Sequence, residues 1–377
     1  MEMMTQNIDL KNLDKSTWKT YRFDQLAQKV SETVDPKTTD LEIYVGLEHL
    51  DRESIHLKRK GVPSDVSGGK LKCYPGDVIF GKRRAYQRKA AIVDFEGICS
   101  AHAFVLRANP EVIDPDLFPF FLHSDLFMHC AVDISVGGLS PTINWGQLKE
   151  QEFLLPPIVQ QAKLAKLLCA MDEVIEKEKV LYSKLHLTIK SEIKMLFKNE
   201  KNKIQIKYLV SKEKQKKGSE GVIPYIEIGD VNLENKKIEF KDKEAVKGSV
   251  IANKNSILIS KVRPSRGAIT ILNQKQVVSN GFSILEPKIE SGIPEFLFHC
   301  LAWNEHFLFS MSRLATGSTY PTISDEDILN YHIPAFSIEK QKQLTEKLDN
   351  IYNLIIDLEF GISSSQSLQK SIINQVF

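Results

Sequence analysis

The chain of 377 residues contains the same succession of motifs twice, about 180 residues apart. A turn that ends in Pro-Thr-Ile occurs at 137–143 and again at 317–323. After each turn come an apolar segment with proline, a glutamine (Gln161 or Gln341) and a leucine-rich helical pattern. Two similar halves predict two similar binding surfaces related by a pseudo-twofold axis. Such a molecule suits a target that is itself roughly twofold, and duplex DNA is the commonest one.

Short β-like runs separated by Gly, Pro and Asp fill the first half, and the same order returns in the second half. The clearest runs are 44–47, 76–80 and 103–106, and their counterparts are 225–228, 255–259 and 282–285. A helix is predicted after the strands of each half, at 117–132 and at 296–309. Each half therefore predicts a mixed α+β domain of about 130 residues, which is large enough to bury its own core.

Two long segments carry apolar residues at alternating steps of four and three, which is typical of a coiled-coil seam. The seam residues are Leu164, Leu168, Met171, Ile175, Leu185 and Ile189 in the first segment, and Leu344, Leu348, Ile351, Ile355 and Leu358 in the second. Two seams of similar length predict an antiparallel pair. A helix over 160–197 is roughly 55 Å long. The pair would thus hold two domains further apart than one DNA turn of about 34 Å. Alternatively, the helices pack on one domain only.

The predicted fold class is α+β, with two similar mixed α/β target-recognition domains joined by two long helices. These helices form an antiparallel coiled coil, and the whole is pseudo-twofold. The expected boundaries are a first recognition domain at 1–155, a central helix at 156–200, a second recognition domain at 201–335 and a C-terminal helix at 336–377.

The composition limits the class of protein but does not identify a partner. A net charge of +2 neither supports nor excludes nucleic acid. The five cysteines form an odd set without a CxxC pair, which indicates reduced thiols in a cytoplasmic protein. No run of about 18 apolar residues occurs, so no membrane span is expected.

The sequence offers no convincing catalytic or metal-binding motif. It contains no GxGxxG or P-loop that opens a helix, and no HExxH. Asp230 followed by Glu239 and Lys241 resembles the carboxylates and lysine of a nuclease, but a charged strand end explains them better. Six histidines and cysteines invite a zinc site, but their spacing is not that of standard ligands; they are His123, His129, Cys130, His299, Cys300 and His306. We predict no catalytic residue and no metal site.

A basic loop directly follows the second predicted strand of each half. Its candidate DNA-binding residues are Lys82, Arg83, Arg84, Tyr86, Gln87, Arg88 and Lys89 in the first half, and Lys261, Arg263, Ser265 and Arg266 in the second. Arginine and glutamine in such a loop make bidentate contacts with guanine and adenine edges, and lysine neutralises phosphates. The alternative is a solvated hairpin tip.

The Pro-Thr-Ile loops are the second candidate surface. Their glycines allow close approach of the backbone, and their hydroxyl groups can donate to phosphates or base edges. The candidate residues are Ser140 and Thr142 in the first half, and Ser318, Thr319, Tyr320 and Thr322 in the second. A plain turn between helix and strand explains the glycine and proline equally well.

Together these motifs resemble the specificity subunit of a Type I restriction–modification system. The resemblance rests on the segments at 44–51 and 225–231, on Gly-Asp-Val-Ile at 76–79 with the lysine and arginine after it, and on the repeated motifs around Gln161 and Gln341. It covers almost the whole chain from about residue 18. It implies that each recognition domain reads one half of an asymmetric bipartite DNA sequence and that the helices fix the gap.

The resemblance also implies partners that carry the chemistry. The chain would recruit two modification subunits, which methylate adenine with S-adenosylmethionine. Restriction subunits dependent on ATP and Mg²⁺ would complete the assembly, and this chain would hold no cofactor. One alternative is the specificity partner of a related enzyme whose nuclease and methyltransferase share a chain. Another is a duplicated coiled-coil scaffold without a DNA role.

Overall fold

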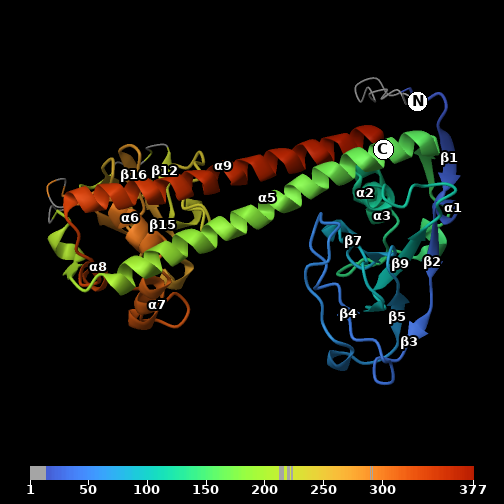
Figure 1. Ribbon diagram of the computed structural model, residues 1–377, viewed down its shortest axis with the longest axis horizontal. Coiled ribbons are helices and arrows are strands. Elements are labelled where there is room, and N and C mark those ends of the chain that lie inside the picture. The colour runs from blue at the N-terminus through green and yellow to red at the C-terminus, as the bar shows by residue number, and fades with distance from the viewer. Residues whose placement is uncertain (1–13, 212–215, 219–220, 222–223, 289, 291) are drawn as a thin grey trace. The chain divides into compact units, whose positions relative to one another are not determined.

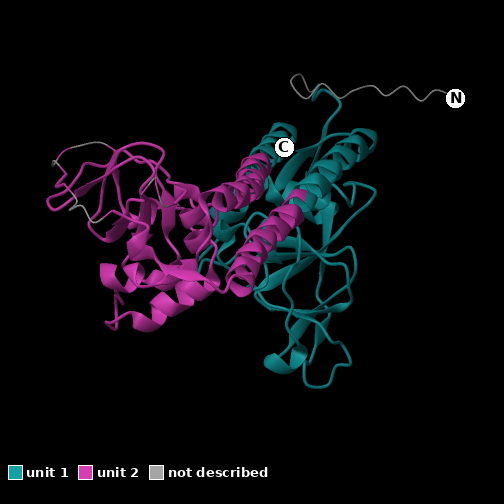
Figure 2. Cartoon of the chain, turned by 60° about the vertical axis from the view of Figure 1, so that its left-hand side comes forward, with its two compact units in different colours: residues 1–177, 363–377 teal, residues 178–362 magenta. Residues whose placement is uncertain are grey.

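The computed structural model describes residues 14–211, 216–218, 221, 224–288, 290 and 292–377. The chain forms two compact units, coloured separately in Figure 2. Unit 1 comprises residues 1–177 and 363–377, and unit 2 comprises residues 178–362. Each unit thus contains one recognition region and a part of each long helix. The four-part division drawn from the sequence stays a prediction.

Unit 1 contains three small sheets, with strand orders β2-β9-β6-β7, β3-β5-β8-β4 and β1-β10 (Figure 1). Its strands are β1 Lys19–Arg22, β2 Ala27–Val30, β3 Thr33–Val34, β4 Tyr44–Val45, β5 Lys70–Cys73, β6 Val78–Gly81, β7 Ala90–Ile92, β8 Gly97–Cys99, β9 Ala103–Ala108 and β10 Glu152–Leu155. Its shorter helices are α1 Phe23–Leu26, η1 Pro63–Asp65, η2 Ala85–Gln87, α2 Phe118–His123, α3 Asp125–Asp133 and α4 Trp145–Leu148.

Unit 2 contains three sheets, with strand orders β15-β14-β17, β12-β16-β13 and β11-β18. Its strands are β11 Lys203–Gln205, β12 Tyr225–Ile226, β13 Val250–Ala252, β14 Ile257–Ser260, β15 Ile269–Ile271, β16 Gln276–Val278, β17 Phe282–Leu285 and β18 His332–Pro334. Its shorter helices are η3 Ile206–Tyr208, η4 Ile228–Asp230, η5 Pro264–Arg266, α6 Pro294–Ala302, α7 Glu305–Leu314 and α8 Asp325–Leu329.

The two units share one topology, which confirms the predicted fold class and repeated order of strands. Strand β6 pairs antiparallel with β7 and β9, as β14 does with β15 and β17. A parallel pair, β4 with β8 or β12 with β16, lies in the second sheet of each unit. The places of β2 and β3 are taken in unit 2 by isolated antiparallel bridges, Val210 with Pro287 and Lys217 with Val250. The alternation of buried apolar strands with short turns explains why both sequences fold in the same way.

Each helix predicted after the strands is in fact two helices. Ser124 adopts an extended backbone between α2 and α3, and its hydroxyl accepts a hydrogen bond from the Phe127 N–H at 3.1 Å. Asn304 caps α7 in the same way, and its side chain accepts from the Phe307 N–H at 3.1 Å. Serine and asparagine favour this N-cap position over a helix interior, so the predicted continuous helices were wrong at these two residues.

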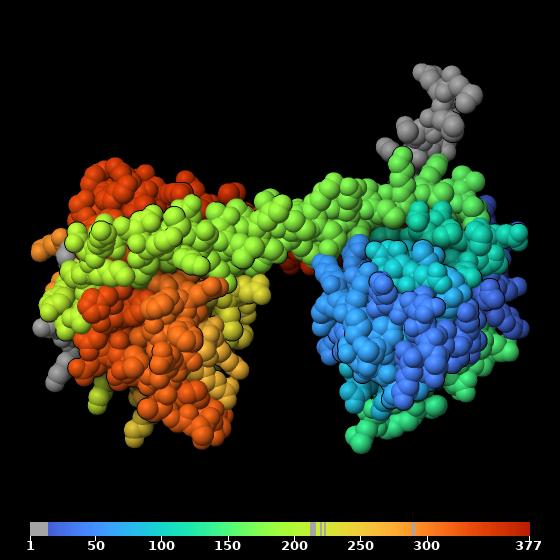
Figure 3. Space-filling view, turned by 60° about the horizontal axis from the view of Figure 1, so that its bottom comes forward, coloured from blue at the N-terminus to red at the C-terminus, as the bar shows by residue number. Residues whose placement is uncertain are grey.

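The long helices are α5, Ile158–Asn199, and α9, Ile338–Val376. In unit 1 they pack through a small apolar cluster that includes Leu164, Leu168, Ile372 and Val376. The Gln369 amide also donates to the Leu168 carbonyl oxygen at 3.3 Å. Many side chains of α5 are exposed in both units, and Figure 3 shows this helix at the surface.

In unit 2 the same two helices run antiparallel. Glu192 of α5 forms an ion pair with Lys347 of α9 at 2.6 Å, while Glu178, further towards the start of α5, lies beside Gly361 of α9. The predicted seam residues Ile189, Leu348 and Ile355 are buried here, and Leu185 and Ile351 pack against them. Thr345 and Tyr352 fill two further buried positions that the apolar pattern did not reveal.

The repeated glutamine joins the start of each long helix to the domain before it. In unit 1 the buried Gln161 accepts a hydrogen bond from the Asp114 N–H at 2.8 Å. Its amide donates to the carbonyl oxygens of Val112 at 2.9 Å and Pro156 at 2.8 Å. All three partners are backbone groups, so the glutamine holds the helix start in a fixed register.

Gln341 makes the matching connection in unit 2. Its carbonyl oxygen accepts from the Ile293 N–H at 3.0 Å, and its amide donates to the Phe336 carbonyl oxygen at 2.9 Å. Gln161 therefore makes three such bonds and Gln341 two.

All five cysteines are free thiols. Among the residues that the structure describes, no helix is long and apolar enough to cross a membrane.

Candidate nucleic-acid interface

In unit 1 the two loops predicted separately from the sequence form one surface. The Arg84 N–H donates to the Pro141 carbonyl oxygen at 2.7 Å, and the Ile143 N–H donates to the Lys82 carbonyl oxygen at 2.9 Å. The basic loop after β6 is therefore bonded along its backbone to the Pro-Thr-Ile loop. We call this combined surface the loop pair of unit 1, residues 82–89 and 137–143.

Unit 2 builds the same loop pair from residues 261–267 and 317–323. The Arg263 N–H donates to the Pro321 carbonyl oxygen at 2.7 Å, and the Ile323 N–H donates to the Lys261 carbonyl oxygen at 3.0 Å. Both units thus hold a lysine and an arginine against a Pro-Thr-Ile turn through the same two backbone bonds. Sequence reasoning found both loops but not their contact, because the bonded residues lie more than 50 positions apart in the sequence.

The arginine of each loop pair has a left-handed backbone. The φ angle is 57° at Arg84 and 49° at Arg263, and each residue precedes a short 3₁₀ helix. A non-glycine residue in this region costs about 1 kcal/mol, and such strain often accompanies a functional site. The backbone bonds to Pro141 and Pro321 hold the two arginines in this conformation.

The side chains of the two arginines lie at the surface beside different neighbours. The Arg84 Nε donates to the Ser140 Oγ at 3.2 Å. The Arg263 guanidinium lies 4.7 Å from the centre of the Tyr320 ring and donates to the Thr319 carbonyl oxygen at 3.3 Å. Both guanidinium groups are free of carboxylate partners among the described residues, so they keep a positive charge at the surface.

The remaining predicted residues differ in exposure. Tyr86 is 53% exposed and Tyr320 63%. The exposed polar residues are Arg83, Ser265, Arg266, Ser318, Thr319 and Thr322, and the half-buried ones are Gln87, Ser140 and Thr142.

Arg88 and Lys89 are engaged inside unit 1. The Arg88 guanidinium pairs with Asp125 at 2.7 Å and donates to the His123 carbonyl oxygen at 2.8 Å. The Lys89 ammonium donates to the Leu47 carbonyl oxygen at 2.6 Å, and burial lowers its pKa. The role of these two residues in binding DNA stays a prediction. In the structure their side chains contact groups of unit 1.

Sequence reasoning missed a group of lysines and aromatic rings next to the loop pair of unit 1. The Lys82 ammonium lies 5.2 Å from the centre of the Phe104 ring. Lys29 of β2 lies 6.0 Å from the same ring and 5.9 Å from that of Trp145. Neither lysine has a carboxylate within ion-pair distance in the described part of the chain, and both burial and the Lys29 charge lower the pKa of Lys82. No local pattern could reveal this group, because its members come from four separate segments.

The matching lysine of unit 2 has an acidic neighbour. Lys261 lies 3.6 Å from the carboxylate of Asp325, the first residue of α8. Asp325 stands 180 residues after Trp145, the first residue of α4. Unit 1 therefore presents two unpaired lysines over aromatic rings, where unit 2 presents one neutralised lysine.

The histidines and the acidic residue considered for metal binding or catalysis contact protein groups. The His123 Nε2 bonds the Ala90 carbonyl oxygen, and the His299 Nε2 bonds Asp349 of α9, at 2.8 and 2.7 Å. Asp230 accepts from the Glu227 N–H at 2.9 Å and caps a turn. These contacts hold helices and turns in place.

Comparison with known proteins identifies similar chains. Residues 190–365 match the type I restriction modification DNA specificity domain. The MjaX specificity subunit of a type I restriction enzyme from Methanocaldococcus jannaschii is 23% identical, over 87% of this chain and 84% of that protein. The EcoDI specificity subunit from Escherichia coli is 28% identical over 43% of this chain and 37% of its own length.

Solved structures with the same fold cover nearly the whole chain. The type I restriction–modification S subunit from M. genitalium has a TM-score of 0.65 at 15% identity, over 97% of this chain and 98% of that one. A chain from a study of assembly and conformational transition in the type I R–M system has a TM-score of 0.55 at 19% identity, over 96% and 97%.

Proposed function

The chain belongs to the family of type I restriction–modification specificity subunits, and from that premise we propose that each unit reads one half of an asymmetric, bipartite DNA sequence. The observation that carries this proposal is the loop pair. Both units build it with the same backbone bonds but line it with different side chains. One frame with two surfaces suits a target whose halves are alike in geometry and different in sequence.

The chemistry of the loop pair fits the edges of base pairs. Arg84 and Arg263 present guanidinium groups, which bind the O6 and N7 atoms of guanine in a bidentate way. The hydroxyl groups around them fit phosphates or base edges, and Lys82 with Lys29 provides charge for the backbone. The alternative of a scaffold without a DNA role does not explain two strained arginines at matching places.

The partners and cofactors follow from the same proposal. The chain would recruit two modification subunits that use S-adenosylmethionine, and restriction subunits that use ATP and Mg²⁺. Catalysis would belong to those subunits, in the cytoplasm, and the long helices would set the gap between the half-sites.

The test is to remove each arginine and to map methylation in a host that carries the modification subunits. Glycine is the best substitute because it tolerates the left-handed backbone. Arg84→Gly should lower methylation for one half of the target, and Arg263→Gly for the other. Loss of a bidentate contact costs about 1–3 kcal/mol, which is about 5–150-fold in relative occupancy.

Arg52→Gly is the matched control, because Arg52 is an exposed arginine of unit 1 outside the loop pair. It should leave the methylated sequence unchanged. If methylation at both half-sites were unchanged in both loop variants, the loop pairs would not be the readers. If no methylation depended on this chain, the scaffold alternative would be favoured.

A further inference from the structure

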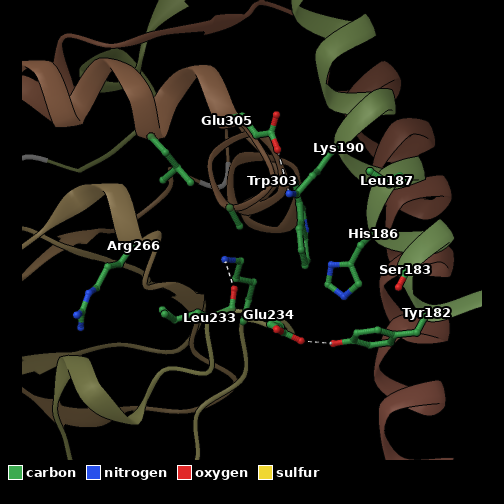
Figure 4. A pocket seen from close by; sticks show the side chains of 13 residues that line it. Tyr182, Ser183, His186, Leu187, Lys190, Leu233, Glu234, Arg266, Trp303 and Glu305 are labelled. Atoms are coloured by element: carbon green, nitrogen blue, oxygen red, sulfur yellow. Dashed lines mark hydrogen bonds and ion pairs between the residues drawn. The ribbon is translucent and has the colours of Figure 1, made fainter. Parts of the chain in front are cut away.

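Unit 2 contains a cavity of about 560 Å³ that the proposed function does not use (Figure 4). It lies between α5, the turn at 233–236 and the junction of α6 with α7. Its volume falls within the range of about 300–1,000 Å³ that is typical of small-molecule sites. Aromatic and apolar side chains form most of its wall, and charged groups lie among them.

A buried lysine forms one side of this cavity. Lys236 is only 6% exposed, and its ammonium donates to the carbonyl oxygens of Leu233 at 2.6 Å and Gly267 at 3.0 Å. No carboxylate of the described chain lies within ion-pair distance of it. Buried charges in proteins are normally paired, and an ammonium has three donors. The ammonium also lies 5.5 Å from the centre of the Trp303 ring. Its charge has no carboxylate to balance it among the described residues, so an anion in the cavity would supply the missing partner.

Unit 1 shows what fills the matching place when no cavity forms. Arg88 ends the 3₁₀ helix after β6, as Gly267 ends the 3₁₀ helix after β14. The Arg88 guanidinium lies 2.7 Å from Asp125 and 3.3 Å from Glu53, which complete its charge. Unit 2 has no side chain at Gly267, and Glu305, which stands 180 residues after Asp125, forms its ion pair with Lys190 instead. Unit 1 is thus neutralised internally, while unit 2 keeps an open cationic cavity.

The opposite wall is aromatic. His186 of α5 lies 4.5 Å from the Tyr182 ring and 5.5 Å from the Trp303 ring, measured between ring centres. Its Nε2 is buried and has no hydrogen-bond partner within the described structure. Figure 4 shows these rings grouped on one side of the cavity, with Lys190 and Glu305 paired above them at 3.0 Å.

We propose that this cavity binds a nucleotide, with its phosphate on Lys236 and its base against the rings of Tyr182 and His186. The unpaired ammonium suits the phosphate, and the free His186 Nε2 suits a donor or acceptor of the base. Three cations (Lys190, Lys236, Arg266) face two carboxylates (Glu234, Glu305) in the lining, which favours an anionic ligand. A free mononucleotide and a nucleotide of DNA share this chemistry.

Calorimetric titration of the full chain with AMP tests the proposal. Saturable binding at one site is expected, with adenosine and inorganic phosphate each binding at least tenfold more weakly than AMP. Lys236→Met should weaken AMP binding at least tenfold. Lys254→Met, which removes an exposed lysine of the same unit, should leave it unchanged.

Two further variants protect the test against a simple loss of folding. His186→Gln keeps a polar side chain and, at about pH 8 where the imidazole is neutral, should weaken AMP binding several-fold with little change in melting temperature. Lys236→Glu combined with Gly267→Arg rebuilds the ion pair of unit 1, fills the cavity and should abolish AMP binding. Absence of saturable binding at millimolar AMP would overturn the proposal, as would equal affinity in the folded variants.

The filled variant also separates the two sources of the nucleotide. If a DNA nucleotide occupies the cavity, the filled variant should bind target duplex more weakly in complex with the modification subunits. If the ligand is free, duplex binding should be unchanged while AMP binding is lost. The AMP titration does not depend on sequence reading, so failure of the proposed function would leave its result intact.

Discussion

The two units form the same hydrogen bonds to their backbones. They differ in the charged side chains that lie beside the loop pairs. The paired loops, the N-caps at Ser124 and Asn304, and the glutamines at the helix starts recur almost atom for atom. Next to the loop pair, however, unit 1 has unpaired Lys29 and Lys82, while unit 2 has Lys261 beside Asp325. The hydrogen bonds that position the loop pair are thus the same in both halves of the duplicated chain, whereas the charged side chains beside it differ.

The largest effect is expected on stability, from the two glutamines that join each long helix to the domain before it. Gln161→Ala removes three hydrogen bonds to backbone groups, and Gln341→Ala removes two. At about 1 kcal/mol for each bond, we expect the free energy of unfolding to fall by about 3 kcal/mol for the first and about 2 kcal/mol for the second. Denaturant unfolding measures both values.

Gln343→Ala is the matched control, because Gln343 lies two residues further along α9 and is exposed, and within the described structure its side chain bonds only Glu339. It should change stability by no more than about 0.5 kcal/mol. If Gln341→Ala lowered the free energy of unfolding by no more than Gln343→Ala does, the glutamine would not stabilise unit 2 as it stabilises unit 1.

The charge difference between the loop pairs gives the next largest effect. Asp325→Asn frees Lys261, so the affinity of the complex for target DNA should rise about two- to fivefold. Its dependence on salt should also steepen by close to one phosphate contact, about 0.9 in log–log slope. Lys82→Gln in unit 1 should act in the opposite direction, because it removes a lysine that has no acid beside it.

Glu326→Gln controls for the Asp325 variant. It makes the same change in net charge within the first turn of α8, but no ion pair joins Glu326 to Lys261. Equal affinities of the Asp325 and Glu326 variants would mean that net charge, and not the release of Lys261, determines the effect.

The sequence predicted those features of the structure that depend on neighbouring residues. Periodicity and turn residues act locally, so three strands of each unit (β4, β6 and β9; β12, β14 and β17), the long helices and the position of the basic loops were found from sequence, while the other strands were not named. The breaks at Ser124 and Asn304 were missed because apolar residues continue across them and hide the N-cap. Coiled-coil spacing found Leu168 and Ile355 but not Thr345, since a buried threonine carries no apolar signal.

The contacts between distant segments could not be predicted in this way. Lys29 reaches the Trp145 ring only because β2 pairs with β9, and that register is a property of the folded sheet. The roles of Arg88 and Gly267 were equally hidden, because an arginine in a basic run gives no sign of its acidic partners.

Two half-buried histidines give the smallest effect and a final contrast between the units. His56 of unit 1 lies 2.7 Å from Asp172, and this hydrogen bond raises its pKa. Its stabilisation is fully present below the unfolded pKa of about 6.5 and is lost as the pH rises through the raised value. Burial instead lowers the pKa of His186 in unit 2, so its stabilisation is present above about pH 6.5 and is lost as the pH falls.

His56→Gln should therefore destabilise the protein more at pH 5.5 than at pH 8. His186→Gln should restore part of the stability that the protein loses at pH 5.5. Each change should be below about 1 kcal/mol in denaturant unfolding, with exposed His102→Gln as the control. The same pH trend in both variants would refute this prediction, because protonation should stabilise the fold at His56 and destabilise it at His186.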